Sequence, residues 1–174
     1  MANNAKHYII TAISLGIIAA ASAGLIGVVN LVTRDQIKKN EEKKFNAGIA
    51  EIFGENKTAS LYQTVNKDNV ETSYYVKNQD ETTIGWAVRA EGSNMYGKIS
   101  LIAGFEYDTK AFIKIYVITN EQSYAQTLVD NYITPLSNNQ IQIDDVNCGA
   151  TYGAKLVRDL INSAQSYVDG IIYE

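Results

Sequence analysis

A threonine hydroxyl at the expected start of a helix is the group in this sequence best placed for chemistry. Thr151 follows Gly149 and Ala150, and apolar residues recur directly after it at three- and four-residue spacing. Helix N-termini expose unpaired N–H groups and the positive end of the helix dipole, so they stabilise phosphate groups. Gly149 and Ala150 leave room for another molecule to approach the hydroxyl. The local pattern alone favours a threonine that caps the helix, with a phosphate site as the alternative.

The wider segment is more specific. Asp145-Val146-Asn147-Cys148-Gly149-Ala150-Thr151 resembles the flavinylation motif D-x-x-S-G-A-T of the FMN-binding domain family. That family includes the G subunit of Rnf complexes and the C subunit of sodium-pumping NADH:quinone reductases. The resemblance implies that a flavin transferase esterifies Thr151 with the phosphate of FMN. It also implies that Gly149 and Ala150 form the close-approach turn, that Asp145 is the acidic residue of the motif, and that Cys148 replaces a serine.

Two further segments extend the resemblance. The region from Gly85 to Val117, with Tyr96 and Gly97 at its centre, is similar to the paired strands of the family. The stretch 119–125 keeps only Glu121 of the family element H-x-E-T-P-G-L-G, and Gly153 stands where the family often has serine. The resemblance implies that Tyr96 and Glu121 lie near the flavin. From the residues alone, Tyr96 is also compatible with core packing and Glu121 with an exposed loop.

The N-terminal region predicts a membrane anchor. Tyr8 to Val32 is an uncharged stretch, and as a helix it would measure about 37 Å, enough to cross a hydrocarbon core of about 30 Å. A signal peptide cleaved after Ala21-Ser22-Ala23 is the alternative. We therefore expect an N-terminal tail, a transmembrane helix, a stalk helix and one FMN-binding domain, over residues 1–7, 8–32, 33–54 and 55–174.

Two arguments about membrane orientation disagree. One lysine precedes the uncharged stretch, whereas one arginine and four lysines follow it within residues 34–44, which favours a cytoplasmic domain. The family resemblance implies the opposite, an FMN domain on the extracytoplasmic face of the cell membrane, where the exported transferase acts. We expect a single-pass protein in contact with membrane lipid, with the orientation that the family implies.

The remaining residues predict an α+β fold. Apolar alternation predicts strands over 70–77, 83–90, 99–106 and 111–118, which follow one another as an antiparallel meander. We expect a stalk helix that stops at Gly54, a helix over 123–133 that ends before Pro135, and a closing helix after Thr151. The segment 55–69 is expected to be a turn or a short strand. One antiparallel sheet with flanking helices results.

Composition excludes several classes of function. The net charge is −4, and no basic stripe with interleaved aromatics is present, so we expect no nucleic-acid partner. Cys148 and His7 are the only residues of their types, and His7 precedes the uncharged stretch. An internal disulfide, a four-cysteine cluster, a histidine triad and a multi-histidine zinc site are therefore excluded. We expect no metal site and no catalytic side chain of the chain's own.

These inferences combine into a functional expectation. The chain looks like a membrane-anchored electron-transfer subunit that carries FMN covalently, within an ion-translocating ferredoxin:NAD oxidoreductase complex of the Rnf type. It would work with other membrane subunits of the Rnf-type or related complex, and the cofactor would supply the redox chemistry. Two alternatives remain open: an extracytoplasmic binding or assembly domain without flavin, and a stand-alone extracellular electron-transfer flavoprotein.

Overall fold

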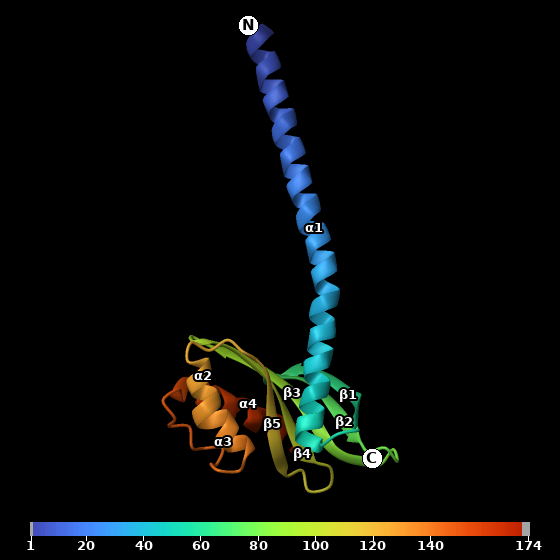
Figure 1. The fold of residues 1–174 in the computed structure, drawn as a ribbon, viewed down its shortest axis with the longest axis vertical. Coiled ribbons are helices and arrows are strands. Elements are labelled where there is room, and N and C mark those ends of the chain that lie inside the picture. The colour runs from blue at the N-terminus through green and yellow to red at the C-terminus, as the bar shows by residue number, and fades with distance from the viewer. Residues whose placement is uncertain (1, 172–174) are drawn as a thin grey trace. The chain divides into compact units, whose positions relative to one another are not determined.

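The computed structural model describes the backbone of residues 2–171 and the side chains of residues 12–26, 28, 33, 36 and 39–171. Two compact units make up the chain, residues 1–42 and residues 43–174. The long helix α1, Ala2–Phe53, contributes to both (Figure 1).

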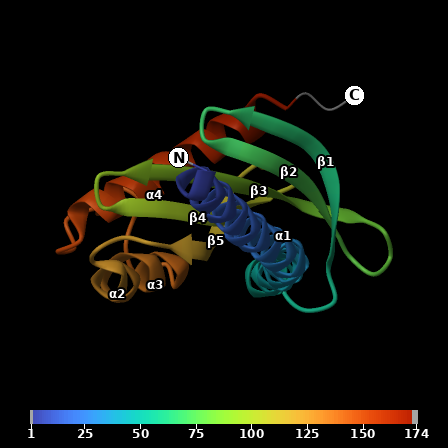
Figure 2. The same ribbon diagram turned by 90° about the horizontal axis from the view of Figure 1, so that it is seen from above.

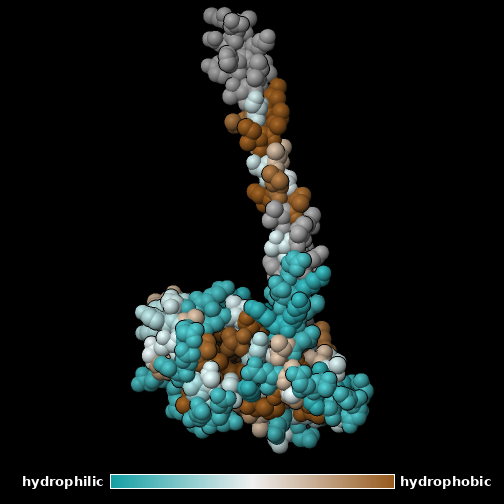
Figure 3. Space-filling view, in the orientation of Figure 1, coloured by the Kyte–Doolittle hydropathy of each residue, from teal (hydrophilic) through white to brown (hydrophobic). Residues whose placement is uncertain are grey.

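The first unit is helical. Of the expected span Tyr8–Val32, the side chains of 12–26 and 28 are described. Figure 3 shows brown, apolar surface along this part of the helix. The large apolar side chains exposed here are Ile13, Leu15, Ile17, Ile18, Leu25, Ile26 and Val28. Among the residues that the structure describes, no helix has both the length and the hydropathy required of a membrane span.

The second unit is built on one antiparallel sheet. Its strands are β1 (Thr58–Lys67), β2 (Val70–Lys77), β3 (Thr83–Asn94), β4 (Gly97–Glu106) and β5 (Phe112–Asn120). Their order in the sheet is their order in the chain, so each strand pairs with the next (Figure 2). The expected α+β class and the antiparallel meander are confirmed.

Helices cover both faces of this sheet (Figure 2). The last turns of α1, within the second unit, place Ile49 and Ile52 against Val76, Ala87 and Ile102 on one face. On the other face, α4 (Thr151–Asp169) packs its apolar stripe onto β3 and β4. Apart from its last residue, β4 is buried from Ile99 onwards because both of its faces are covered. The sheet is therefore the middle layer of three.

Two elements differ from the expectations. β1 is a full ten-residue edge strand where a turn or short strand is expected. The helix expected over 123–133 continues past Pro135 as α2 (Ala125–Leu128), η1 (Val129–Ile133) and α3 (Thr134–Ser137). The physical reason is η1, a turn of π-helix in which the Thr134 N–H bonds to the Val129 carbonyl five residues back. This wider turn directly precedes Pro135, which lacks an N–H, and the helix continues.

The stalk helix ends where the sequence predicts. Gly54 follows the last residue of α1 with φ +90°, and its N–H bonds to the Ala50 carbonyl at 2.9 Å. This is the left-handed C-terminal stop for which glycine is suited.

Candidate functional site

Thr151 is the first residue of α4, and it does not cap this helix. Ala150 occupies the N-cap position, and its carbonyl accepts the Ala154 N–H at 3.0 Å. Alanine has no side-chain acceptor, and among the described residues no side chain caps this helix start. The first amides of an α-helix have no acceptor within the helix. The N–H groups of this first turn are therefore available to an anion.

The loop that leads to Thr151 is held by the helical run α2–η1–α3. Asn131 Nδ2 donates to the Cys148 carbonyl at 3.0 Å, and the buried Tyr132 hydroxyl donates to the Ile143 carbonyl. Burial raises the pKa of Tyr132, which therefore stays protonated and keeps donating. These two bonds fix both halves of the loop that precedes the site.

Asp145 closes a turn within this loop. Its carboxylate accepts the Gln142 N–H at 2.8 Å, and its own N–H donates to the Gln142 carbonyl at 3.1 Å. The carboxylate is exposed at the surface. In this structure Asp145 shapes the loop and leaves its side chain accessible to solvent.

Gly149 turns the chain into α4. Its φ of +84° lies in the left-handed region, where a side chain would be strained. Cys148, directly before it, is half-buried and packs against the main core cluster. After this turn Ala150 packs in the core cluster, and both Ala150 and Thr151 line a cavity.

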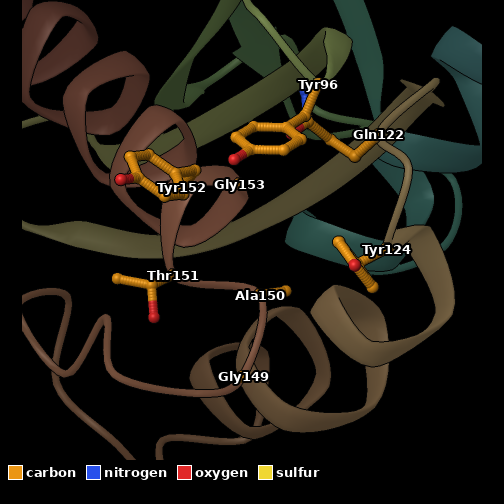
Figure 4. Close-up of a pocket in the computed structure, with 8 residues that line it drawn as sticks. All are labelled: Tyr96, Gln122, Tyr124, Gly149, Ala150, Thr151, Tyr152 and Gly153. Carbon is orange, nitrogen blue, oxygen red and sulfur yellow. The ribbon is translucent and has the colours of Figure 1, made fainter.

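The cavity has a volume of about 280 Å³ and is formed by three segments that lie far apart in the sequence. The turn between β3 and β4 contributes Tyr96, and the segment after β5 contributes Gln122 and Tyr124. The helix start contributes the remaining lining residues: Gly149, Ala150, Thr151, Tyr152 and Gly153. Figure 4 shows Thr151 and Tyr152 on one side of Ala150 and Tyr124 on the other.

Aromatic rings line much of this cavity. The rings of Tyr96 and Tyr152 are 5.2 Å apart between centroids and tilted by 34°, and Figure 4 shows Tyr96 pointing toward Tyr152. Tyr124 and Tyr152 each keep 61% of their surface exposed. Lys155 Nζ lies 6.0 Å from the centroid of the Tyr152 ring and adds a positive charge beside the helix start. The site combines aromatic surface with positive potential.

Gln122 forms a buried polar wall of the cavity. Its side-chain Nε2 donates to Asn94 Oδ1 at 3.1 Å and to the Gly97 carbonyl at 2.5 Å. Asn94 in turn donates through Nδ2 to the Tyr152 carbonyl at 3.1 Å. This network ties the β3–β4 turn, the segment after β5 and the first turn of α4 together.

Gly153 is required by close packing. A Cβ at this position would lie 2.8 Å from Leu128 Cδ2 and 3.3 Å from Gln122 Oε1. The first contact is shorter than van der Waals contact allows, so a serine here would displace the Leu128 side chain. The glycine brings the helix start close to the Gln122 amide.

The structure brings together some of the residues singled out in the sequence. Thr151, Gly149, Ala150 and Tyr96 line one cavity. Glu121 is exposed and does not line it; its neighbour Gln122 does. Asp145 and Cys148 shape the approach to the cavity and are not among its lining residues.

Sequence reasoning did not find Gln122, Tyr124 or Tyr152 as lining residues. The two tyrosines carry a signal, because each flanks a segment already suspected. Gln122 carries no such sequence signal, because only the turn after β5 determines whether Glu121 or Gln122 faces the cavity. Among the described residues, no group of histidine, cysteine, aspartate and glutamate side chains is arranged to hold a metal ion.

Comparison with known proteins gives one family match. Residues 1–52 match the family model described as the RnfG N-terminal region, which covers most of α1 and ends before the sheet. A search among curated proteins finds no match.

Proposed function

We propose that this chain carries FMN covalently on Thr151. The match over residues 1–52 supports membership of the RnfG-type family and a role as a subunit of an Rnf redox complex. In this proposal the chain is a single-pass membrane subunit of an ion-translocating complex. Its FMN domain faces the extracytoplasmic side, and it passes electrons between partner subunits.

The observation that carries the proposal is the Thr151 hydroxyl at an uncapped helix start that opens into a cavity. A phosphoester bond between Thr151 Oγ1 and the FMN phosphorus would place the remaining phosphate charge at the amides of the first turn. Those amides and the helix dipole stabilise an anion there. A flavin transferase would perform the transfer from a flavin dinucleotide donor: the pyrophosphate bond of the donor would break, the nucleoside monophosphate would leave, and the Thr151 hydroxyl would lose its proton. The chain would gain the mass of FMN less one water.

The residues present fit the other parts of FMN. Beyond the phosphate, the flavin has a polyol chain and a flat aromatic ring. Gln122 supplies a polar group beside the helix start, and Tyr96, Tyr124 and Tyr152 supply aromatic surface. A cavity of about 280 Å³ lies just below the usual size range for small-molecule sites. It would hold the phosphate and the polyol chain, and the exposed Tyr124 and Tyr152 would offer aromatic surface to the ring.

Each residue then has a binding role, and the bound flavin supplies the transfer of electrons. Thr151 holds the phosphate, and Gly149 and Ala150 keep the approach free of side chains. The Asn131 and Tyr132 bonds keep the loop in place. Asp145, exposed on the loop, is available for recognition by the transferase.

Mass and fluorescence of the purified chain test the proposal. The full chain, expressed with its own transferase and purified from membranes, should run as a fluorescent band on a denaturing gel. Its intact mass should exceed the chain mass by one FMN less one water. Thr151→Ala should abolish both signals. A chain without fluorescence and without added mass would refute the proposal.

Cys148→Ser provides the matched control. The family motif has serine at this position, and Cys148 does not line the cavity. The variant should therefore keep the full adduct. Loss of the adduct in Cys148→Ser would mean that the cysteine, and not the threonine hydroxyl alone, takes part in attachment.

A second candidate function is an assembly or binding domain that keeps this fold without flavin. The exposed position of Glu121 favours it, because the one residue retained from the family element does not line the cavity. The same mass measurement separates the two candidates, since the assembly domain would carry no adduct in the presence of transferase.

A further inference from the structure

The side-chain carbonyl of Gln122 has a fixed direction. Both hydrogens on Nε2 are used, one toward Asn94 Oδ1 and one toward the Gly97 carbonyl. The amide group is planar, so two acceptors bound by Nε2 fix the plane of the group and thereby where Oε1 points. Oε1 lies 3.3 Å from the Cβ position of Gly153, at the first turn of α4.

None of the described residues donates a hydrogen bond to Oε1, although the Gln122 residue is only 6% exposed. Figure 4 shows the Gln122 side chain extending toward Tyr96, and both residues line the cavity. Oε1 is not among the described buried side-chain atoms that lack a partner, so solvent in the cavity reaches it, and a ligand hydroxyl there would take the place of water.

The position of Oε1 selects which part of a flavin it meets. Gln122 and Thr151 line the same cavity, so a group attached to Thr151 that occupies this cavity lies within reach of the Gln122 side chain. A phosphodiester carries no proton at neutral pH and cannot donate to a carbonyl oxygen. The aromatic ring is separated from the phosphate by the length of the polyol chain. The hydroxyls of that chain are the donors within reach.

We propose that Gln122 is a specificity-determining residue whose side-chain oxygen accepts a hydrogen bond from the polyol chain of the flavin, an assignment that rests on the flavin function proposed above. Asn94 is the positioning residue that holds the amide in this direction. Gly153 has no Cβ to stand between Oε1 and the helix start. The site therefore distinguishes a polyol phosphate from an alkyl phosphate of the same length.

Two ligands that differ only in these hydroxyls provide the test. The full chain, expressed without transferase and purified in detergent, is titrated with FMN and with an analogue whose ribityl chain is replaced by a pentyl chain. Binding is followed by flavin fluorescence. We expect the native chain to bind FMN about 3- to 10-fold more tightly, which is the effect of one neutral hydrogen bond. Equal affinities in the native chain would overturn the proposal without any substitution.

Two variants separate a direct contact from a structural role. Gln122→Met keeps the length of the side chain, and it should bind the two flavins equally. Asn94→Ala breaks the same network but leaves the Gly97 carbonyl to hold Nε2, so it should keep a preference for FMN. A preference that persists in Gln122→Met, or that is lost equally in Asn94→Ala, would overturn the assignment. If the native chain binds neither flavin and gains no adduct with transferase, the flavin function itself fails, which is a distinct result.

Discussion

Replacing Tyr132 with phenylalanine should destabilise the protein at neutral pH and stabilise it, relative to the native chain, in strong base. The substitution removes one hydroxyl from a fully buried ring and breaks its bond to the Ile143 carbonyl. A neutral hydrogen bond contributes about 0.5 to 1.5 kcal/mol net. The half-buried Ile143 can regain part of its hydration. We therefore expect a loss of about 1 kcal/mol at pH 7.

The effect reverses in base because burial raises the pKa of Tyr132 above its ordinary value. In the unfolded chain a tyrosine releases its proton near pH 10, whereas the folded protein retains it. The stability contributed by this proton is complete below pH 10 and is lost as the pH rises further, by up to about 1.4 kcal/mol per pH unit. The stabilities of native chain and variant should cross between about pH 10 and pH 11.

Urea unfolding followed by far-UV circular dichroism at pH 7, 9, 10 and 11 would measure both curves. Burial also raises the pKa values of Tyr75 and Tyr167, so both proteins should lose stability in base and only their difference reports Tyr132. Tyr124→Phe is the control: its ring is 61% exposed, and it should change stability by less than about 0.5 kcal/mol at pH 7. Parallel curves without a crossing would refute the reasoning about Tyr132.

Two further predictions concern the walls of the cavity. Gly153→Ala should lower the free energy of unfolding by about 1 to 3 kcal/mol, because its Cβ would lie 2.8 Å from Leu128 Cδ2. Leu128→Ala alone should lower it by about 2 to 5 kcal/mol. The double variant should lose less stability than the sum of the two single variants, by at least about 0.5 kcal/mol. Strict additivity in urea unfolding would show that the two positions do not compete for space. Asn131→Ala should remove the hydrogen bond to the Cys148 carbonyl and make the loop before Thr151 more sensitive to limited proteolysis by thermolysin. Asn138→Ala, at the start of the same loop, is the control. Unchanged cleavage in Asn131→Ala would show that this bond does not hold the loop.

The bounds of β2 were predicted correctly, and the strand is covered on both faces: Val70 lies in one core cluster and Val76 in the other. The full length of β1 was not predicted, because it is an edge strand with little burial on either face and its polar sequence shows no alternation. Its structure comes from pairing with β2, a tertiary contact that no local pattern reveals.

The candidate site was predictable at Thr151 and less so around it. The motif identified the hydroxyl, Gly149 and Ala150, which are adjacent in sequence and share the start of α4. The opposite wall depends on which way the chain turns after β5. Asn120 accepts the Gln122 N–H at 3.2 Å, and this turn directs Gln122 inward and leaves Glu121 exposed. This turn depends on tertiary packing, so a sequence motif cannot show whether residue 121 or residue 122 lines the cavity.

Three segments line the cavity, so the residues around Thr151 and the residues of the facing wall belong to different parts of the chain. If Thr151 carries FMN as proposed, the linkage depends on residues 149–153, whereas the facing wall comes from Tyr96, Gln122 and Tyr124 on other segments. Substitution of the exposed Tyr124 would then change the surroundings of a bound ring while the linkage stays the same. The proposed flavoprotein would in this way allow a redox potential to be tuned at the wall of its site.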